Sequence, residues 1–119
     1  MNRKCTVFKT ARFIGKRWTL LILLELYKGK SRRKRYSELK ERLINITPKI
    51  LSTRLKELEK EGLVEKRITA DKFPIKSEYS LTASGRDFIS VIRGIKKWAL
   101  KWDKGSVICE NRDCKHCEF

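Results

Sequence analysis

The amino-acid sequence predicts a small, mainly α-helical domain that carries one β-hairpin. Apolar residues recur at helical spacing along several stretches, and two short stretches alternate between apolar and polar residues. The chain has 119 residues and is 40% hydrophobic, which suits one domain with its own core. Its 30 lysines and arginines outnumber its 14 acidic residues, so the net charge is +16. Such a charge favours an anionic partner, namely nucleic acid, an acidic membrane or an acidic protein.

Two helices are predicted near the start of the chain. Phe8, Ala11 and Ile14 lie at helical spacing and predict a short helix over residues 7–14, which a glycine ends. Residues 18–27 are almost wholly apolar and predict a buried helix, also followed by a glycine. A basic run without any acid comes next and consists of Lys28, Lys30, Arg32, Arg33, Lys34 and Arg35. We interpret it either as a solvated loop or, because it precedes the next helix, as a phosphate contact.

A helix-turn-helix is predicted after this run. Ser37 can cap a helix that continues through Leu43. Thr47 followed by Pro48 is a strong signal for the start of a helix. Threonine caps the first turn, and proline is tolerated at the first helical position because the N–H that it lacks would have no partner within the helix. The second helix is expected to stop at Gly62. A tight turn joins two such helices in a helix-turn-helix.

The second helix of this pair has two chemically distinct faces. At about 100° per residue, Leu51, Leu55 and Leu58 fall on one side. The opposite side carries Lys49, Ser52, Thr53, Lys56 and Lys60, with no acid among them. An ordinary amphipathic surface helix would carry both signs of charge there, so the pattern favours contact with DNA.

A β-hairpin and a long helix complete the domain. Residues 63–68 and 77–81 predict two strands joined by a loop over residues 69–76, which together would form a wing. The basic residues of this wing are Arg67, Lys72 and Lys76. Thr82 caps the last helix, whose apolar stripe consists of Phe88, Val91, Ile92, Ile95, Trp98, Ala99 and Trp102. Two tryptophans exceed what a small core needs, so we expect this stripe to meet a partner; folding back onto its own core is the alternative.

Four sequence features occur together in a fixed order. Residues 14–23 read IGKRWTLLIL, residues 46–59 read ITPKILSTRLKELE, residues 73–82 read FPIKSEYSLT, and Cys5 precedes all three. These features resemble the HxlR-type winged helix regulators, relatives of the MarR group, whose motifs are IGGKWTLLIL, ISxKMLSxRLxxLE and VPPxVEYxLT. The likeness covers about residues 5–102. The departures from the pattern are Arg17, Ile75, Ser77 and a cysteine-rich tail.

The resemblance implies a winged helix-turn-helix that dimerises through its terminal helices. Two recognition helices would enter successive major grooves of operator DNA, with the wings along the minor groove. Most such proteins repress, and several sense electrophiles or oxidants through the N-terminal cysteine. We therefore expect residues 1–103 to form the DNA-binding and dimerisation domain and residues 104–119 to form the cysteine-rich tail.

The residues expected to act fall into three groups. Phosphate contacts are expected from Arg35, Ser37 and Arg54. Base or groove contacts are expected around Thr47, Lys49, Ser52, Thr53 and Lys56, and wing contacts from Arg67, Lys72 and Lys76. Dimerisation is expected to use Phe8, Ile92, Ile95, Trp98 and Trp102.

The cysteines, Cys5, Cys109, Cys114 and Cys117, allow three interpretations. The last three have the spacing C-x4-C-x2-C beside His116, which permits zinc or an iron–sulfur cluster with Cys5 as the fourth ligand. A disulfide switch, for example between Cys5 and a tail cysteine, is the second interpretation. Reduced thiols without a role are the third.

Taken together, the sequence predicts a sequence-specific DNA-binding transcriptional regulator, a repressor, that acts as a homodimer and responds to redox state or metal. One alternative is a small cysteine-ligated metal or electron-transfer protein whose basic surface docks an acidic partner. Another is a winged helix that contacts RNA or protein. An enzyme is not expected, because there is one histidine and no glycine-rich phosphate loop. We expect a cytoplasmic protein without a membrane partner, since the longest apolar run, residues 20–24, is too short for a span.

Overall fold

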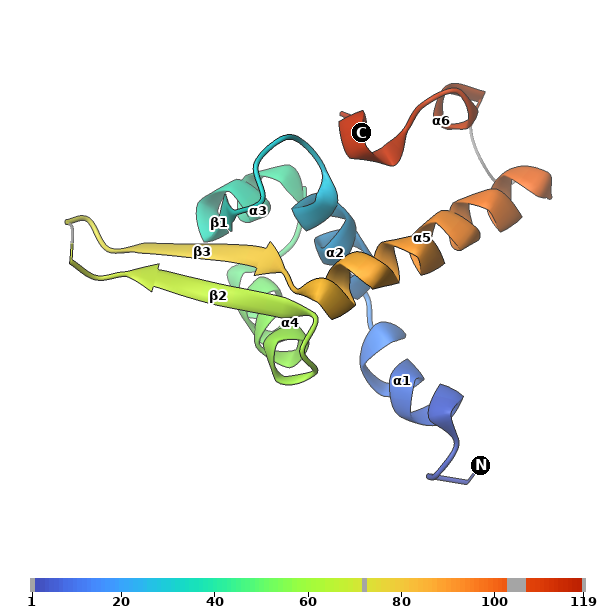
Figure 1. The fold of residues 1–119 in the computed structure, drawn as a ribbon, viewed down its shortest axis with the longest axis horizontal. Coiled ribbons are helices and arrows are strands. Elements are labelled where there is room, and N and C mark those ends of the chain that lie inside the picture. The colour runs from blue at the N-terminus through green and yellow to red at the C-terminus, as the bar shows by residue number, and fades with distance from the viewer. Residues whose placement is uncertain (1, 72, 103–106, 119) are drawn as a thin grey trace.

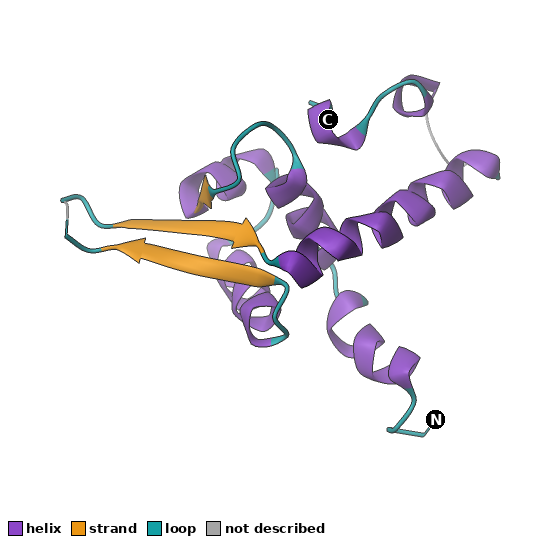
Figure 2. Ribbon diagram, in the orientation of Figure 1, coloured by secondary structure: helices purple, strands orange, loops and turns teal. Residues whose placement is uncertain are grey.

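The computed structural model describes residues 2–71, 73–102 and 107–118 (Figure 1). The helices are α1 (Thr6–Ile14), α2 (Thr19–Tyr27), α3 (Tyr36–Arg42), α4 (Pro48–Lys60), α5 (Ala83–Lys101) and α6 (Val107–Glu110), with a short 3-10 helix over Cys114–His116. The strands are β1 (Lys34–Arg35), β2 (Val64–Thr69) and β3 (Lys76–Leu81). The predicted mainly helical fold with a β-hairpin is confirmed (Figure 2).

Helix α2 lies at the centre of the core, which explains its almost wholly apolar sequence. Ile22 and Leu23 are completely buried, and α2 packs against α3, α4, α5 and β3. On α4, the predicted inner residues Leu51, Leu55 and Leu58 are at most 1% exposed. Burial of each leucine contributes roughly 2 kcal/mol, so these contacts determine which face of α4 points outward.

The hairpin belongs to an antiparallel sheet with the strand order β1-β3-β2. Strands β2 and β3 pair from Val64 opposite Leu81 to Thr69 opposite Lys76, within one residue of the predicted boundaries. The sequence pattern does not predict β1, because two basic residues carry no alternation. Its extended conformation is set by pairing with β3, where Arg35 lies opposite Glu78.

Capping explains where the two longest helices begin. Thr47 Oγ1 accepts a hydrogen bond from the N–H three residues later at 3.2 Å, and Thr82 makes the equivalent bond at 3.1 Å. Both predicted caps are confirmed. The predicted cap at Ser37 is wrong: α3 begins at Tyr36 because β1 continues directly into it, so Ser37 lies within the first turn.

Part of the basic run between α2 and α3 is structural, which corrects its interpretation as a solvated loop or phosphate contact. Lys28 Nζ and Arg42 Nε each lie 3.5 Å from the buried carboxylate of Glu25. Lys34 Nζ donates to the backbone carbonyls of Glu25 and Lys28, and burial lowers the pKa of Lys34. Lys28 and Lys34 therefore hold the end of α2. The exposed residues of the run are Lys30, Arg32, Arg33 and Arg35.

The C-terminal tail returns to the end of α2. The backbone carbonyl of Lys115 accepts a hydrogen bond from Gly29 N–H at 2.8 Å, and Lys115 Nζ donates to Tyr27 O at 2.7 Å. Arg42 Nη2 donates to Glu118 O at 3.2 Å. By contrast, α1 and the C-terminal half of α5 project from the domain (Figure 1). None of the helices in the described ranges has both the length and the apolar character that a membrane span requires.

Candidate nucleic-acid interface

The outward face of α4 is basic and open. Its exposed side chains are Lys49, Thr53, Lys56 and Lys60, and Ser52 is half-buried beside them. No acidic residue of α4 falls within the arc that these side chains span, although Glu57 and Glu59 flank it. Thr47 is exposed at the start of the helix, where its hydroxyl oxygen already accepts the capping hydrogen bond.

Tyr36 connects the two helices of the helix-turn-helix and orients Ser52. Its hydroxyl donates to Pro48 O at 2.9 Å and lies 3.2 Å from Ser52 Oγ. Because the single phenolic proton is used on Pro48, the Ser52 hydroxyl donates to Tyr36. The Ser52 oxygen is then left as an acceptor toward the outside. Helical spacing does not indicate this role of Tyr36, because its hydroxyl partners depend on the crossing of two helices.

Thr53 also has an orientation set by its own helix. Its Oγ1 donates to Lys49 O at 2.8 Å, one turn earlier. The hydroxyl proton is therefore directed back along the helix, and the side chain keeps an acceptor oxygen and a methyl group. These are the two groups with which threonine contacts base edges and the thymine methyl.

Arg54 is a positioning residue rather than an open phosphate ligand. Its Nη1 lies 2.7 Å from Glu57, and its Nε donates to Arg17 O at 3.1 Å. Lys16 Nζ binds the other carboxylate oxygen of Glu57 at 2.7 Å. The hydrogen bond from Lys16, followed by that from Arg54, lowers the pKa of Glu57. The cluster fixes α4 against the loop between α1 and α2.

The predicted DNA contacts outside α4 do not form one continuous basic surface. Arg35 and Ser37 are exposed at the start of α3, and Arg67 is exposed on β2. Glu78 lies opposite both Arg35 and Arg67 in the sheet register, so an acid separates these two basic residues. Lys76 is half-buried at the start of β3, and the predicted contact Lys72 lies outside the described residues.

The tip of the wing exposes two large apolar side chains that are absent from the predicted contacts. Phe73 is 97% exposed and Ile75 is 64% exposed. Neither side chain contributes to the core, so packing does not explain them. The sequence does indicate them, because two large apolar residues occur in a predicted loop that has no side facing the core.

Comparison with known proteins identifies this arrangement. A model of the HxlR-like helix-turn-helix family matches residues 13–106. The chain belongs to the HxlR-like helix-turn-helix family. Members of this HxlR-like family are DNA-binding transcriptional regulators and not enzymes, as the sequence predicts.

Two Bacillus subtilis proteins illustrate the relationship. The HTH-type transcriptional regulator YvaP is 40% identical over 94 residues, which cover 79% of this chain and 83% of YvaP. The HTH-type transcriptional regulator YodB is 34% identical over 111 residues, which cover 92% of this chain and 96% of YodB. The reduced form of YodB superposes with a TM-score of 0.72 over 86% of this chain and 98% of the YodB chain. The redox regulator HypR in its oxidised form is 30% identical and superposes with a TM-score of 0.70 over 92% of this chain and 99% of the HypR chain.

The four cysteines of this HxlR-like chain do not gather at one site. Cys5 is the N-cap residue of α1, at the opposite end of the molecule from the tail (Figure 1). Cys109 and Cys114 line an apolar cavity of about 350 Å³ against α2 and α5. Cys117 lies near Glu25 at the end of α2. Within the described ranges, no three His, Cys, Asp or Glu side chains come together to hold a metal ion, and zinc or an iron–sulfur cluster stays a prediction.

The predicted dimerisation residues divide into exposed and buried ones. Ile95, Trp98 and Trp102 are 45%, 56% and 60% exposed along α5, and Phe8 of α1 is half-buried. Ile92 is only 8% exposed and belongs to the core, which corrects its placement on a partner-facing surface. Val91, which belongs to the predicted stripe of α5, is also exposed, and Val7 and Leu21 are exposed apolar residues that the sequence pattern did not indicate.

Proposed function

We propose that this HxlR-like chain binds operator DNA sequence-specifically as a homodimer and represses transcription by occupying a promoter. The observation that carries the proposal is the open, acid-free outward face of α4. Lys49, Ser52 and Thr53 of this face lie in the first turns of α4, as expected for a recognition helix whose first turns contact base edges. The net charge of +16 supports binding to the phosphate backbone.

Specificity is assigned to a few side chains on this face. Lys49 offers a donor to guanine O6 and N7. Ser52, held as an acceptor by Tyr36, suits the amino group of cytosine or adenine. Thr53 offers its methyl group to thymine. Exposed arginines and lysines at the start of α3 and on the wing supply affinity that does not depend on sequence.

The homodimer is supported by the exposed apolar side chains of α1, α2 and α5. These are Val7, Leu21, Val91, Ile95, Trp98 and Trp102. A monomer rarely leaves so many large apolar side chains in water. Covering them with a second copy would place two α4 helices on one assembly, which a two-fold symmetric operator requires.

The test is DNA binding by the full chain to duplexes selected in vitro from a random pool. If a dimer neutralises about 8 phosphates, log K should fall with log salt concentration at a slope of about −7. Lys49→Ala should cost roughly 1–3 kcal/mol on the selected site and less on random DNA. The matched control is Lys97→Ala, which removes the same charge from the exposed side of α5 and should have little effect. Equal losses from Lys49→Ala on both DNAs, or a slope shallower than about −2, would contradict the proposal.

We further propose that thiol oxidation controls this binding. Two relatives support this: HypR is named a redox regulator, and YodB is described in reduced and diamide-treated forms. Because Cys5 and the tail lie far apart in one chain, a disulfide between them would join two chains. Peroxide would accept two electrons and two protons from the thiols, giving the disulfide and two waters.

Non-reducing electrophoresis tests this redox step. Peroxide should produce a cross-linked dimer of the wild type that dithiothreitol reverses, together with a change in DNA affinity. Cys5→Ser should stay monomeric on the gel and should not change its affinity. Unaltered DNA binding of the oxidised wild type would rule out redox control but not DNA recognition.

A further inference from the structure

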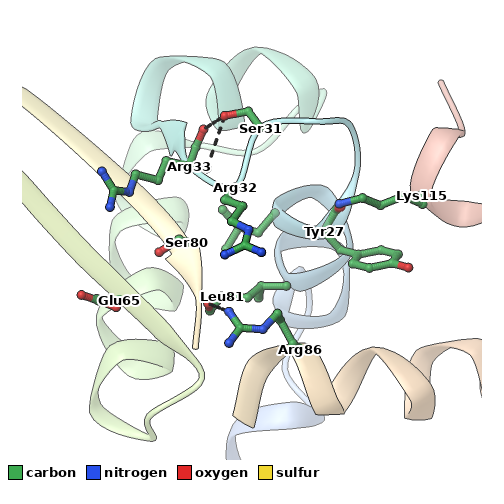
Figure 3. Close-up of a pocket in the computed structure, with 10 residues that line it drawn as sticks. Tyr27, Ser31, Arg32, Arg33, Glu65, Ser80, Leu81, Arg86 and Lys115 are labelled. Carbon is green, nitrogen blue, oxygen red and sulfur yellow. Dashed lines mark hydrogen bonds between the residues drawn. The ribbon is translucent and has the colours of Figure 1, made fainter. Parts of the chain in front are cut away.

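A depression at the base of the hairpin gathers basic side chains away from the outward face of α4 (Figure 3). Its volume is about 350 Å³, within the range of small-molecule sites. The lining comes from the end of α2, the loop before β1, the paired ends of β2 and β3, the start of α5 and the tail. The charged residues among the lining are Arg32, Arg33, Arg86, Lys115 and Glu65.

Two guanidinium groups face the same space in this depression. Figure 3 shows Arg32 above Leu81 and Arg86 below it, with the Arg86 guanidinium turned toward Leu81, whereas Arg33 points away from this space. Arg86 Nη1 donates to Leu81 O at 2.9 Å, which holds that side chain in place. Within the described part of the chain, Arg32 has no hydrogen bond or ion pair. Lys115 is already engaged by Tyr27 O, so the two arginines supply the available donors.

The chemistry of the lining selects a particular kind of ligand. Arg32 and Arg86 are two cations that line one depression, and an oxyanion between them would relieve their repulsion. The forked guanidinium matches a carboxylate, and the half-buried Ser80 hydroxyl adds a further polar group. Leu26 and Leu81 are buried at the floor and offer an apolar contact.

We propose that this depression binds a small organic acid, with its carboxylate between Arg32 and Arg86 and its carbon body against Leu26 and Leu81. The site is separate from the DNA-facing surface. It adjoins Leu81 at one end of β3, whereas Lys76 lies at the other end of the strand, near the tip of the wing. The five residue steps between these positions span roughly 17 Å. A bound acid would contact both the base of the wing and the start of α5. Control of DNA binding by the acid rests on the proposed function, but binding of the acid itself does not.

The experiment titrates the full chain with hexanoate in the absence of DNA, at about 0.15 M salt, and follows amide and arginine Nε resonances by NMR. We expect saturable shifts confined to residues 26–27, 31–33, 80–81 and 86. Hexanamide, which lacks the charge, should bind at least about tenfold more weakly. Inorganic phosphate, which lacks the carbon body, should bind at least about fivefold more weakly. Shifts spread over α4 and the wing, or equal binding of either probe, would overturn the assignment.

Matched variants locate the carboxylate. Arg32→Gln should raise the dissociation constant of hexanoate by roughly tenfold or more, because a charge-assisted pair is lost. Arg33→Gln removes the same charge from the adjacent position and should leave that constant within about twofold. Arg86→Gln should weaken binding as Arg32→Gln does. Because Arg86 also binds Leu81 O, Arg86→Lys is made as well; it keeps the positive charge and tests whether the forked guanidinium is needed. An unchanged constant in Arg32→Gln, or an equal loss in Arg33→Gln, would overturn the proposal whether or not the protein binds DNA.

Discussion

Neighbouring side chains on α4 have different tasks that helical spacing alone does not separate. Lys49 and Lys56 are exposed and open to a ligand. Arg54 lies between them in sequence and Glu57 follows Lys56, but these two side chains bind each other and the α1–α2 loop. Burial of the leucine face turns the basic side of α4 outward. The Glu57 cluster then fixes the orientation of α4 relative to the α1–α2 loop.

The Glu57 cluster gives the stability of the domain a defined pH dependence. Because the folded state lowers the pKa of Glu57 below 4.5, its ion pairs stabilise the fold above that pH. This contribution is lost as the pH falls through the lowered pKa of the folded state. Glu57→Gln should therefore reduce the free energy of unfolding at pH 7 by roughly 1 kcal/mol, since the pairs are partly exposed. Below the lowered pKa, the variant and the wild type should converge.

Urea denaturation between pH 7 and the acid limit of the native state measures this difference. The control is Glu61→Gln, which removes an exposed carboxylate from the end of the same helix, where the described residues give it no ion pair. A Glu57→Gln difference that stays constant with pH, or that Glu61→Gln reproduces, would show that the cluster does not carry the effect.

The helices and the hairpin were predictable wherever local chemistry determines them. The starts of α4 and α5 follow from Thr47 and Thr82, because capping involves only the next three residues. The inner face of α4 follows from the spacing of its leucines. Strand β1 and the start of α3 could not be predicted, because pairing with β3 sets their conformation. The same reason applies to Lys34, whose partners are carbonyls at the end of another element.

In the candidate interface, exposure was predictable but orientation was not. The outward position of Lys49, Thr53 and Lys56 follows from one helix alone. The hydrogen bond that turns Ser52 into an acceptor needs Tyr36 of α3, and no spacing within α4 indicates it. Similarly, the acid between Arg35 and Arg67 depends on the register of three strands.

The junction between the hairpin and α5 depends on the absence of a side chain at Gly85. A Cβ at this position would lie 2.1 Å from Leu63 O, a backbone atom that also accepts a hydrogen bond from Thr82 N–H. Gly85→Ala should therefore lower the free energy of unfolding by roughly 1–3 kcal/mol, because the start of α5 must move away from the sheet.

Urea denaturation of Gly85→Ala and Gly94→Ala provides a matched comparison within α5. A Cβ at Gly94 meets no atom within 4 Å, so this substitution should stabilise the helix by up to about 1 kcal/mol. Opposite signs for the two variants are expected. Stabilisation by Gly85→Ala would mean that the contact between α5 and Leu63 is looser than the structure shows.

The molecule is more extended than a compact chain of its length, which fits the homodimer proposed above. The Cα radius of gyration is 15.4 Å, whereas a compact chain of this length would have roughly 13.5 Å. The excess reflects α1, the wing and the C-terminal half of α5, which project from the core (Figure 1). Exposed apolar side chains occur on the wing, at Ile68, Phe73 and Ile75, and along α5, at Val91, Ile95, Trp98 and the C-cap Trp102. Those of α5 share one side of the helix, so we expect α5 to gain most from a second copy.

Trp98 is the side chain on which this assembly can be tested. It is 56% exposed and lies in the part of α5 that projects from the domain, so a charge there should leave the core intact. A buried interface tryptophan contributes about 2 kcal/mol or more, and two-fold symmetry places it in the interface twice. Trp98→Glu should therefore raise the dimer dissociation constant by roughly a thousandfold, with a matching loss of operator affinity. Sedimentation equilibrium measures the first effect, and Lys97→Glu, an exposed neighbour on the same helix, controls for the added charge. If Trp98→Glu remained as dimeric as Lys97→Glu, the two copies would have to meet through a surface other than α5.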